Sequence, residues 1–172
     1  MLSFVIASCS GTSTALVLIS ILLYEWMIGS IMCQPGFNIF ENANKISIVT
    51  DLGYTTTEIV ERLYNSRLVI LEANHDEKML IASTKYPAML KNRILGKFGH
   101  LSNINSAKVV ASLAQNNVKQ VLFAHLSEET NTPDVCYNTI CTYLKSVGIE
   151  PNVNIKLDIA KPLGVGPVFV LK

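Results

Sequence analysis

Short apolar runs that alternate with amphipathic helical patterns are the feature that most constrains the fold of this chain. The runs cover residues 45–50, 67–71 and 118–124, and the middle one has no polar side chain after Arg67. Such a run is typical of a strand that is buried on both faces, since a strand with one wet face would alternate polar and apolar residues. Strands of this kind, separated by helices, predict an α/β domain.

Helix start and stop signals lie between the runs. Thr55 and Glu58 have the spacing of a capping box, and Pro87 suits the first turn of a helix. A helix that begins at Thr132-Pro133 should end at Gly148, because glycine readily adopts the left-handed conformation that terminates helices. We also expect a helix over Ala107, Val110, Ala111 and Ala114, a loop or short helix after residue 76, and two final strands at residues 153–159 and 167–171.

The amino-terminal segment, residues 1–34, differs from the rest in composition. Residues 1–44 contain no Lys or Arg, and residues 15–32 are almost continuously apolar. The length fits a membrane helix at about residues 15–33, but Glu25 within it would cost about 2.5 to 3.5 kcal/mol near the bilayer centre. A membrane helix and a buried or aberrant segment therefore both remain open. We expect the α/β unit itself to occupy residues 35–172.

Composition limits the class of protein further. The 172 residues suffice for one domain with a core. A net charge of +1, from 14 Lys and Arg against 13 Asp and Glu, predicts no partner bound by bulk electrostatics, although a local basic patch is possible. The cysteines have no Cys-x-x-Cys spacing, so we interpret them as reduced thiols of a cytoplasmic protein. They are Cys9, Cys33, Cys136 and Cys141.

Each of the three runs leads to a residue that can bind metal or transfer a proton. Asp51, Glu72 and His125 stand at their carboxyl ends, and His100 precedes the next helix, where backbone N–H groups would favour a phosphate. Any one of them could be a turn former, a solvated loop residue or a core histidine. Their coincidence at strand ends, where α/β domains bind ligands, predicts a shared site.

The chemistry that such a set supports is hydrolytic. Carboxylate and neutral imidazole ligands suit zinc, which acidifies a bound water toward neutral pH. A Glu–His pair beside the metal could protonate a leaving oxygen, with the carboxylate orienting the imidazole. His75, three residues after Glu72, is a further candidate for substrate binding.

Four motifs in this order resemble a known family. They are Ile-Val-Thr-Asp51-Leu-Gly-Tyr, Val-Ile-Leu-Glu72-Ala-Asn-His-Asp, Gly99-His100-Leu-Ser-Asn and Ala124-His125-Leu-Ser-Glu-Glu-Thr-Asn-Thr-Pro. Over about residues 35–172 the chain is similar to the carboxyl half of metallo-β-lactamase-fold hydrolases, closest to the YycJ/WalJ type, which is related to tRNase Z and RNase J. The resemblance implies an αββα sandwich, mostly its C-terminal βα half.

The resemblance also implies roles for the site residues. Asp51 would bridge two zinc ions, His125 would be the last histidine ligand of the second zinc, and Glu72 with His100 would assist the leaving group. The implied activity is phosphodiester hydrolysis, of the exonuclease kind on DNA, so the implied partner is a nucleic acid.

One departure from the family is large. The His-x-His-x-Asp-His motif of the family's first half is absent, although residues 1–14 look like a degraded copy of its opening strand. We hypothesise a deletion, frameshift or split gene that removed about a hundred residues, the size of half such a domain. With two zinc ligands left, we expect little or no activity from the truncated chain unless an N-terminal fragment complements it. The alternative is a non-catalytic remnant that binds nucleic acid or a partner, either with or without membrane association.

Overall fold

The computed structural model describes residues 3–8, 16–20, 36–41, 43–160 and 169–171, and the side-chain surroundings of residues 36–40 and 43–160. The chain divides into two compact units. The larger is Gln34–Ile159, and the smaller combines Met1–Cys33 with Ala160–Lys172. Because the candidate site residues all lie in the larger unit, its architecture is the one that matters for function.

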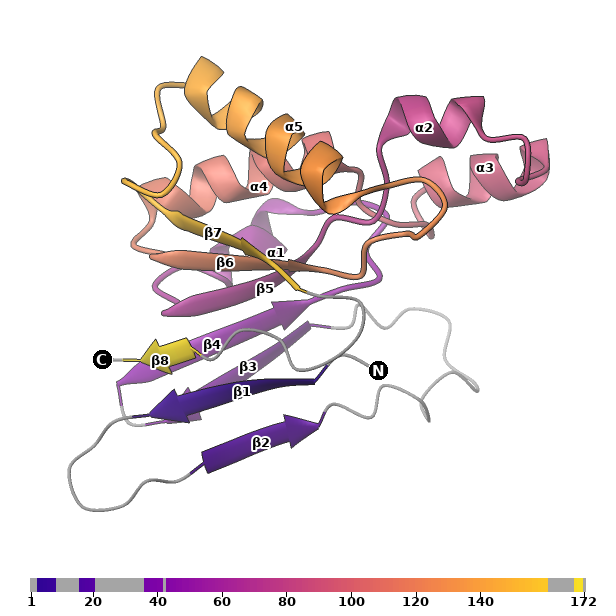
Figure 1. The fold of residues 1–172 in the computed structure, drawn as a ribbon. Helices are drawn as coiled ribbons and strands as arrows, with labels where there is room; N and C mark the ends of the chain where they lie inside the picture. The colour runs from indigo at the N-terminus through magenta and orange to yellow at the C-terminus, as the bar shows by residue number, and fades with distance from the viewer. Residues whose placement is uncertain (1–2, 9–15, 21–35, 42, 161–168, 172) are drawn as a thin grey trace. The chain divides into compact units, whose positions relative to one another are not determined.

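The larger unit is built on a five-stranded sheet with the order β3-β4-β5-β6-β7 (Figure 1). β4 to β7 run parallel, and β3 pairs antiparallel with β4 through a hairpin. The predicted α/β class is therefore confirmed. The strands are β3 (Gly36–Glu41), β4 (Asn44–Val49), β5 (Leu68–Glu72), β6 (Gln120–Ala124) and β7 (Lys156–Ile159). The helices are α1 (Thr57–Glu61), α2 (Glu77–Ala82), α3 (Ala88–Leu95), α4 (Asn103–Gln115) and α5 (Pro133–Ser146).

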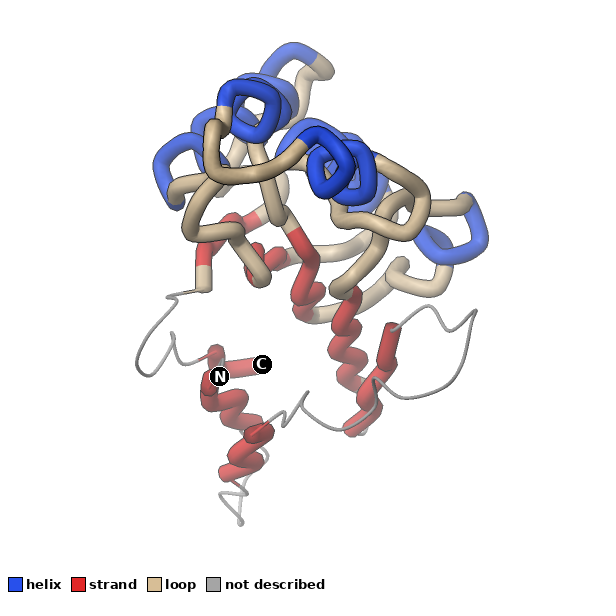
Figure 2. The backbone as a smooth tube through the Cα atoms, turned by 90° about the vertical axis from the view of Figure 1, so that its right-hand side faces the viewer, coloured by secondary structure: helices blue, strands red, loops and turns tan. Residues whose placement is uncertain are grey.

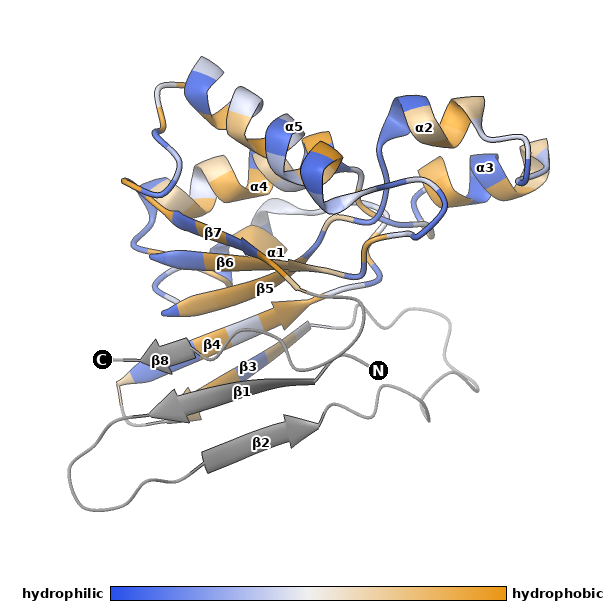
Figure 3. Cartoon of the chain, in the orientation of Figure 1, coloured by the Kyte–Doolittle hydropathy of each residue, from blue (hydrophilic) through white to orange (hydrophobic). Residues whose placement is uncertain are grey.

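The helices of this unit lie over one face of the sheet, as Figures 1 and 2 show. Alternate strand residues such as Leu71 and Phe123 meet Leu113 of α4 and Ile140 of α5 in a continuous apolar core. The intervening residues of β5, among them Ile70, are buried as well, which is why β5 is hydrophobic over most of its length in Figure 3. The prediction of strands that are buried on both faces holds for β5.

Helix starts lie within one residue of the expected signals, and Pro87, predicted in the first turn of a helix, is the N-cap residue of α3. Thr132 caps α5 by accepting from the Val135 N–H, and Gly148 after the helix has a φ of +78°. The predicted capping box at Thr55 is wrong by one residue, because Thr56 caps α1 instead. Glu58 then no longer stands at the third helical position, and its carboxylate pairs with Arg62 at 2.7 Å.

Two strands depart from the predicted layout. The sequence analysis predicts no strand at residues 36–41, where the structure has β3. Phe37 and Phe40 on this edge strand are largely exposed. The final predicted strand exists as β8 (Phe169–Leu171), but it belongs to the smaller unit. There it pairs parallel with β1 (Ser3–Ser8), in a three-stranded sheet with the order β2-β1-β8.

The apolar run at residues 15–33 falls only partly on described residues. Leu16–Ser20 forms β2, which pairs antiparallel with β1, so this part is a strand and not a helix. Residue 15 and residues 21–33 lie outside the described part of the chain. No helix among the described residues has the length and apolar character needed to cross a bilayer.

The two cysteines of α5 should differ in reactivity. Burial, together with the neighbouring Cys141, raises the pKa of Cys136 to about 12, so at pH 8 only about one thiol in ten thousand would be ionised. Cys141 is partly exposed. We expect iodoacetamide to label Cys141 in the native chain and Cys136 only after unfolding in guanidinium, as measured by peptide mass spectrometry. Equal labelling of the two in the native chain would contradict the buried position of Cys136.

Candidate functional site

Four side chains that the sequence analysis singled out meet at the carboxyl end of the sheet. Asp51, Glu72 and His125 follow or end β4, β5 and β6, and His100 comes from the loop before α4. One ligand atom from each lies within 4.8 Å of the others. The parallel strand order explains this meeting, since neighbouring parallel strands end at the same edge of the sheet.

Glu72 contacts three separate segments of the chain: the loop after β4, the loop before α4 and the end of β6. Its side chain is 0% exposed. Oε2 accepts the backbone N–H of Leu52 at 2.9 Å, and Oε1 lies 2.7 Å from His100 Nδ1 and 2.9 Å from His125 Nδ1. The carboxylate therefore fixes the start of the Asp51 loop and both imidazoles at once.

Asp51 completes the group from the exposed side. Its Oδ1 lies 3.6 Å from His125 Nδ1 and 3.8 Å from His100 Nδ1, longer than hydrogen bonds. The two imidazole rings meet edge to face, with centroids 5.1 Å apart and planes at 83°. The result is a cluster of two carboxylates and two imidazoles with their ligand atoms converging.

The electrostatics of the cluster favour the ionised form of Glu72. Burial acts to raise the pKa of Glu72, but hydrogen bonds and charges of His100 and His125 outweigh it, and the net pKa is lowered. The contact with Glu72 raises the pKa of His125 against the opposing effect of burial. A positive charge is therefore stabilised at this point between the carboxylates.

The cluster also fits a metal ion. His125 Nδ1 is buried and has no aligned hydrogen-bond partner, in spite of its short distance to Glu72. A buried imidazole nitrogen that has no aligned partner and lies next to carboxylate oxygens could bind zinc or a related cation once it is deprotonated. Asp51 and His125 could bind such an ion, and the Glu72–His100 pair stands beside them.

Two residues of the cluster have unusual backbone conformations. Asp51 has a φ of 61° and His125 a φ of 58°, a left-handed region that costs a residue other than glycine about 1 kcal/mol or more. Asn74 helps to hold the second of these turns, because its side chain donates to the His125 carbonyl at 2.9 Å and its own carbonyl accepts from Ser127 N–H at 2.8 Å. The orientation of the His125 ring thus depends on Asn74, which is two residues from Glu72 in sequence.

A buried amide network supports Asn74 in turn. Asn131 donates to the carbonyls of Ala73 and Asn74 at 2.9 and 3.1 Å, and it exchanges two side-chain hydrogen bonds with Asn103 at the start of α4. The sequence analysis missed these asparagines as supporting residues. Asn74 and Asn131 do stand inside the quoted motifs, but nothing in one sequence shows that the two motifs bond to each other.

His75 does not join the cluster. Its side chain is buried, with the residue 1% exposed, and neither ring nitrogen has a hydrogen-bond partner among the described residues. Burial lowers its pKa, so the ring is held in the neutral form. The backbone of His75 instead aligns the site, since its carbonyl accepts the N–H of Asn103 at 2.9 Å.

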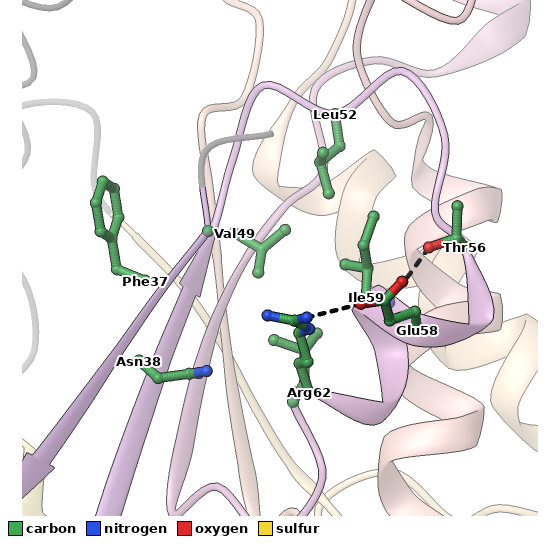
Figure 4. A pocket seen from close by; sticks show the side chains of 10 residues that line it. Phe37, Asn38, Val49, Leu52, Thr56, Glu58, Ile59 and Arg62 are labelled. Carbon is green, nitrogen blue, oxygen red and sulfur yellow. Dashed lines mark hydrogen bonds and ion pairs between the residues drawn. The ribbon is translucent and has the colours of Figure 1, made fainter. Parts of the chain in front are cut away.

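A separate hollow of about 290 Å³ lies between α1 and the β3–β4 hairpin (Figure 4). Val49, Leu52 and Ile59 line it together with the Glu58–Arg62 ion pair. None of the four cluster residues borders it. Leu52 links the two places, because its side chain lines this hollow while its N–H binds Glu72.

Comparisons with known proteins agree with the resemblance seen in the motifs. The chain is 30% identical over 116 residues to exodeoxyribonuclease YycJ of Bacillus anthracis, a match that covers 67% of this chain and 44% of that protein. It is 32% identical over 135 residues to exodeoxyribonuclease WalJ of Streptococcus pneumoniae serotype 2 (strain D39 / NCTC 7466), covering 75% of this chain and 50% of that one. The chain thus spans about half the length of these relatives, and its resemblance to the YycJ/WalJ type is confirmed.

No protein-family model matches the chain. Among solved structures, the metallo-β-lactamase fold protein YhfI from Bacillus subtilis aligns with a TM-score of 0.49 and 14% identity, over 73% of this chain and 41% of that one.

Asn74→Ala should weaken metal binding without touching a ligand. The His125 carbonyl would lose its partner and the ring its fixed direction, and loss of such a supporting contact typically lowers metal affinity by about 10- to 100-fold. Competition with a chromophoric chelator would measure the affinity of the purified chain for zinc. Asn116→Ala is the matched control, because Asn116 also donates to a backbone carbonyl, that of Ser112, but far from the cluster. Equal zinc affinities for the two variants would contradict the supporting role of Asn74.

Proposed function

Because the chain is a relative of the YycJ and WalJ exodeoxyribonucleases across about half of their length, we propose that it is part of a metal-dependent phosphodiester hydrolase of the metallo-β-lactamase type. The observation that best supports the proposal is the 2.7 Å contact between Glu72 Oε1 and His100 Nδ1, beside Asp51 and His125. A proton-transfer pair next to metal-binding side chains is what hydrolysis of a phosphodiester requires. The substrate is DNA, degraded from an end.

Asp51 and His125 would hold the metal, which we take to be zinc on its preference for imidazole and carboxylate ligands. When bound, zinc polarises a phosphoryl oxygen and lowers the pKa of a bound water. Asp51 is exposed at the mouth of the cluster, so its carboxylate can also face a second ion. The neighbouring Glu72 adds negative charge without being accessible itself.

Glu72 and His100 would carry the proton to the leaving oxygen. The carboxylate is fixed by the Leu52 N–H and would accept the Nδ1–H of His100, which orients the imidazole ring. The other ring nitrogen, Nε2, would carry the proton that passes to the leaving alkoxide. The His100 side chain is 30% exposed, enough for contact with a substrate. His75 belongs to the layer that supports this pair, since its buried ring offers a substrate no access.

The ligand set in this chain is incomplete. Asp51 and His125 are two protein ligands, whereas catalytic zinc sites usually have three, and the sequence has no His-x-His-x-Asp-His motif. We therefore infer weak or no activity from this chain alone and full activity only with a complementing segment that supplies histidines. The free thiols of Cys136 and Cys141 support a reducing, cytoplasmic setting.

Complementation should restore nuclease activity. A fragment that carries the missing histidine motif, taken from the amino-terminal half of a WalJ-type relative and added in excess, should produce zinc-dependent release of nucleotides from labelled DNA. Glu72→Gln should reduce that activity by about 100-fold or more, the usual worth of a proton-transfer group, while still accepting the Leu52 N–H. Glu61→Gln on the exposed surface of α1 is the control and should leave the activity unchanged. Full activity of Glu72→Gln would refute the assigned role.

Zinc stoichiometry should reveal the incomplete ligand set. We expect the purified chain to bind fewer than two zinc ions with high affinity, because two ligands cannot hold a dinuclear centre. His125→Ala should abolish what binding remains. Equilibrium dialysis with metal analysis would test both points. Tight binding of two zinc ions by the chain alone would overturn the account of the missing ligands.

A further inference from the structure

We propose that the segment at residues 96–98 and the loop after Asp51 form a binding surface for a single-stranded nucleic acid end. Phe98 and Tyr54 would stack on unpaired bases, and Arg93, Lys97 and Lys108 would bind phosphates. The inference rests on the proposed hydrolase function and deepens it, because it says which form of substrate reaches the cluster and by what contacts.

Charge is distributed unevenly in a way that favours phosphate. Residues 77–98, which include α2 and α3, contain five Lys and Arg and one Glu, whereas the rest of the chain contains nine basic and twelve acidic residues. The near-neutral total therefore conceals a local cationic segment. This segment is followed after one residue by His100, so the positive charges are close in sequence to the cluster.

Most of these cations are available to a ligand. Among the described residues, only Lys85 of the five pairs with a carboxylate, at 2.6 Å from Glu129. Lys91 donates to the carbonyl of Ile81. Arg93 and Lys97 are exposed and have no acidic partner in this part of the structure. Exposed cations of this kind attract phosphate with a strong dependence on salt.

The same segment exposes large apolar side chains. Phe98 is 87% exposed and Met89 84% exposed, and in α2 and α3 only Leu80 is buried. Tyr54, on the loop after Asp51, is 44% exposed. Aromatic rings that stand in solvent among cations are the combination that single-strand binding proteins use, because every unpaired base offers a face for stacking.

Backbone contacts hold these rings next to the cluster. A Cβ on Gly53 would collide with the carbonyls of Gly96 and Lys97, so the two loops touch through their backbones. Tyr54 follows Gly53 on one loop, and Phe98 follows Lys97 on the other. The loops also carry Asp51 and His100, so each ring stands within three residues of a cluster residue.

A hollow of about 190 Å³ adjoins the same loop. Tyr54, Thr55, Leu101, Asn105 and Lys108 line it. Lys108 projects from α4 and donates to the Asn105 side chain at 3.1 Å. The hollow joins an aromatic ring to an ammonium group and to amide and hydroxyl groups, which suits a nucleotide unit. A base-paired duplex would keep its base faces covered and could use only the cations.

Binding can be measured without catalysis. The full chain, kept free of metal with EDTA, is titrated into a fluorescently labelled oligothymidylate, and anisotropy gives the dissociation constant. Phe98→Ala should weaken binding at least about fivefold, the worth of one stacked base, and Phe98→Trp should restore it. Phe40→Ala removes an aromatic ring that is 69% exposed on β3 and should have no effect.

Salt dependence tests the cations separately. Lys97→Ala should reduce the slope of log affinity against log salt by about 0.7, the value for one phosphate contact with a single strand. Lys119→Ala is the matched control and should leave the slope unchanged. Lys119 is an exposed lysine just before β6, whereas His125 follows the opposite end of the same strand.

Three results would overturn the proposed surface. The first is failure of the chain to bind the oligothymidylate at low salt, and the second is equally tight binding of a blunt duplex. In the third, Phe98→Ala would weaken binding only to anionic phospholipid vesicles and leave oligothymidylate binding unchanged. Failure of the hydrolase proposal would look different, with no complemented activity but intact, Phe98-dependent binding of the single strand. A complemented nuclease whose oligothymidylate affinity is unaffected by Phe98→Ala would refute the surface alone.

Discussion

The buried carboxylate of Glu72 is the interaction on which the site depends. A charge at this depth is tolerated only when hydrogen-bonded partners surround it, and removing one partner of such a pair typically costs about 3 to 5 kcal/mol. Here the Leu52 N–H and His100 are hydrogen-bonded to Glu72, and His125 Nδ1 lies 2.9 Å from its Oε1. They come from the ends of β4 and β6 and from the loop before α4, so one side chain on β5 fixes three separate segments.

Asparagine side chains fix the backbone turns that carry these contacts to Glu72. His125 adopts a left-handed backbone next to a parallel strand end, and the Asn74 side chain satisfies its carbonyl. Asn131 and Asn103 continue the network to the start of α4. Buried amides that bond to one another and to backbone carbonyls favour a single geometry, and side chains whose ligand atoms converge require a geometry of that kind.

Much of the larger unit could be predicted from pattern alone. The apolar runs gave β4, β5 and β6, since a strand that is buried on both faces has few alternatives, and the Thr132-Pro133 signal gave α5. Local reasoning was wrong where neighbouring choices are nearly equal in energy, as with Thr55 against Thr56 as the cap of α1. It missed β3, because an edge strand with exposed Phe37 and Phe40 has no buried pattern to detect.

The sequence by itself determined which residues could do chemistry, because Asp51, Glu72, His100 and His125 stand at positions where strands end or a helix begins. Their division of labour was decided by tertiary structure. Only the parallel strand order brings the ligand atoms within 4.8 Å, and only packing makes Glu72 the buried member and Asp51 the exposed one. Packing likewise buries the His75 side chain, although His75 is only three residues from Glu72. Spacing along a chain fixes where a side chain begins, whereas its solvation and its partners depend on segments far away in sequence.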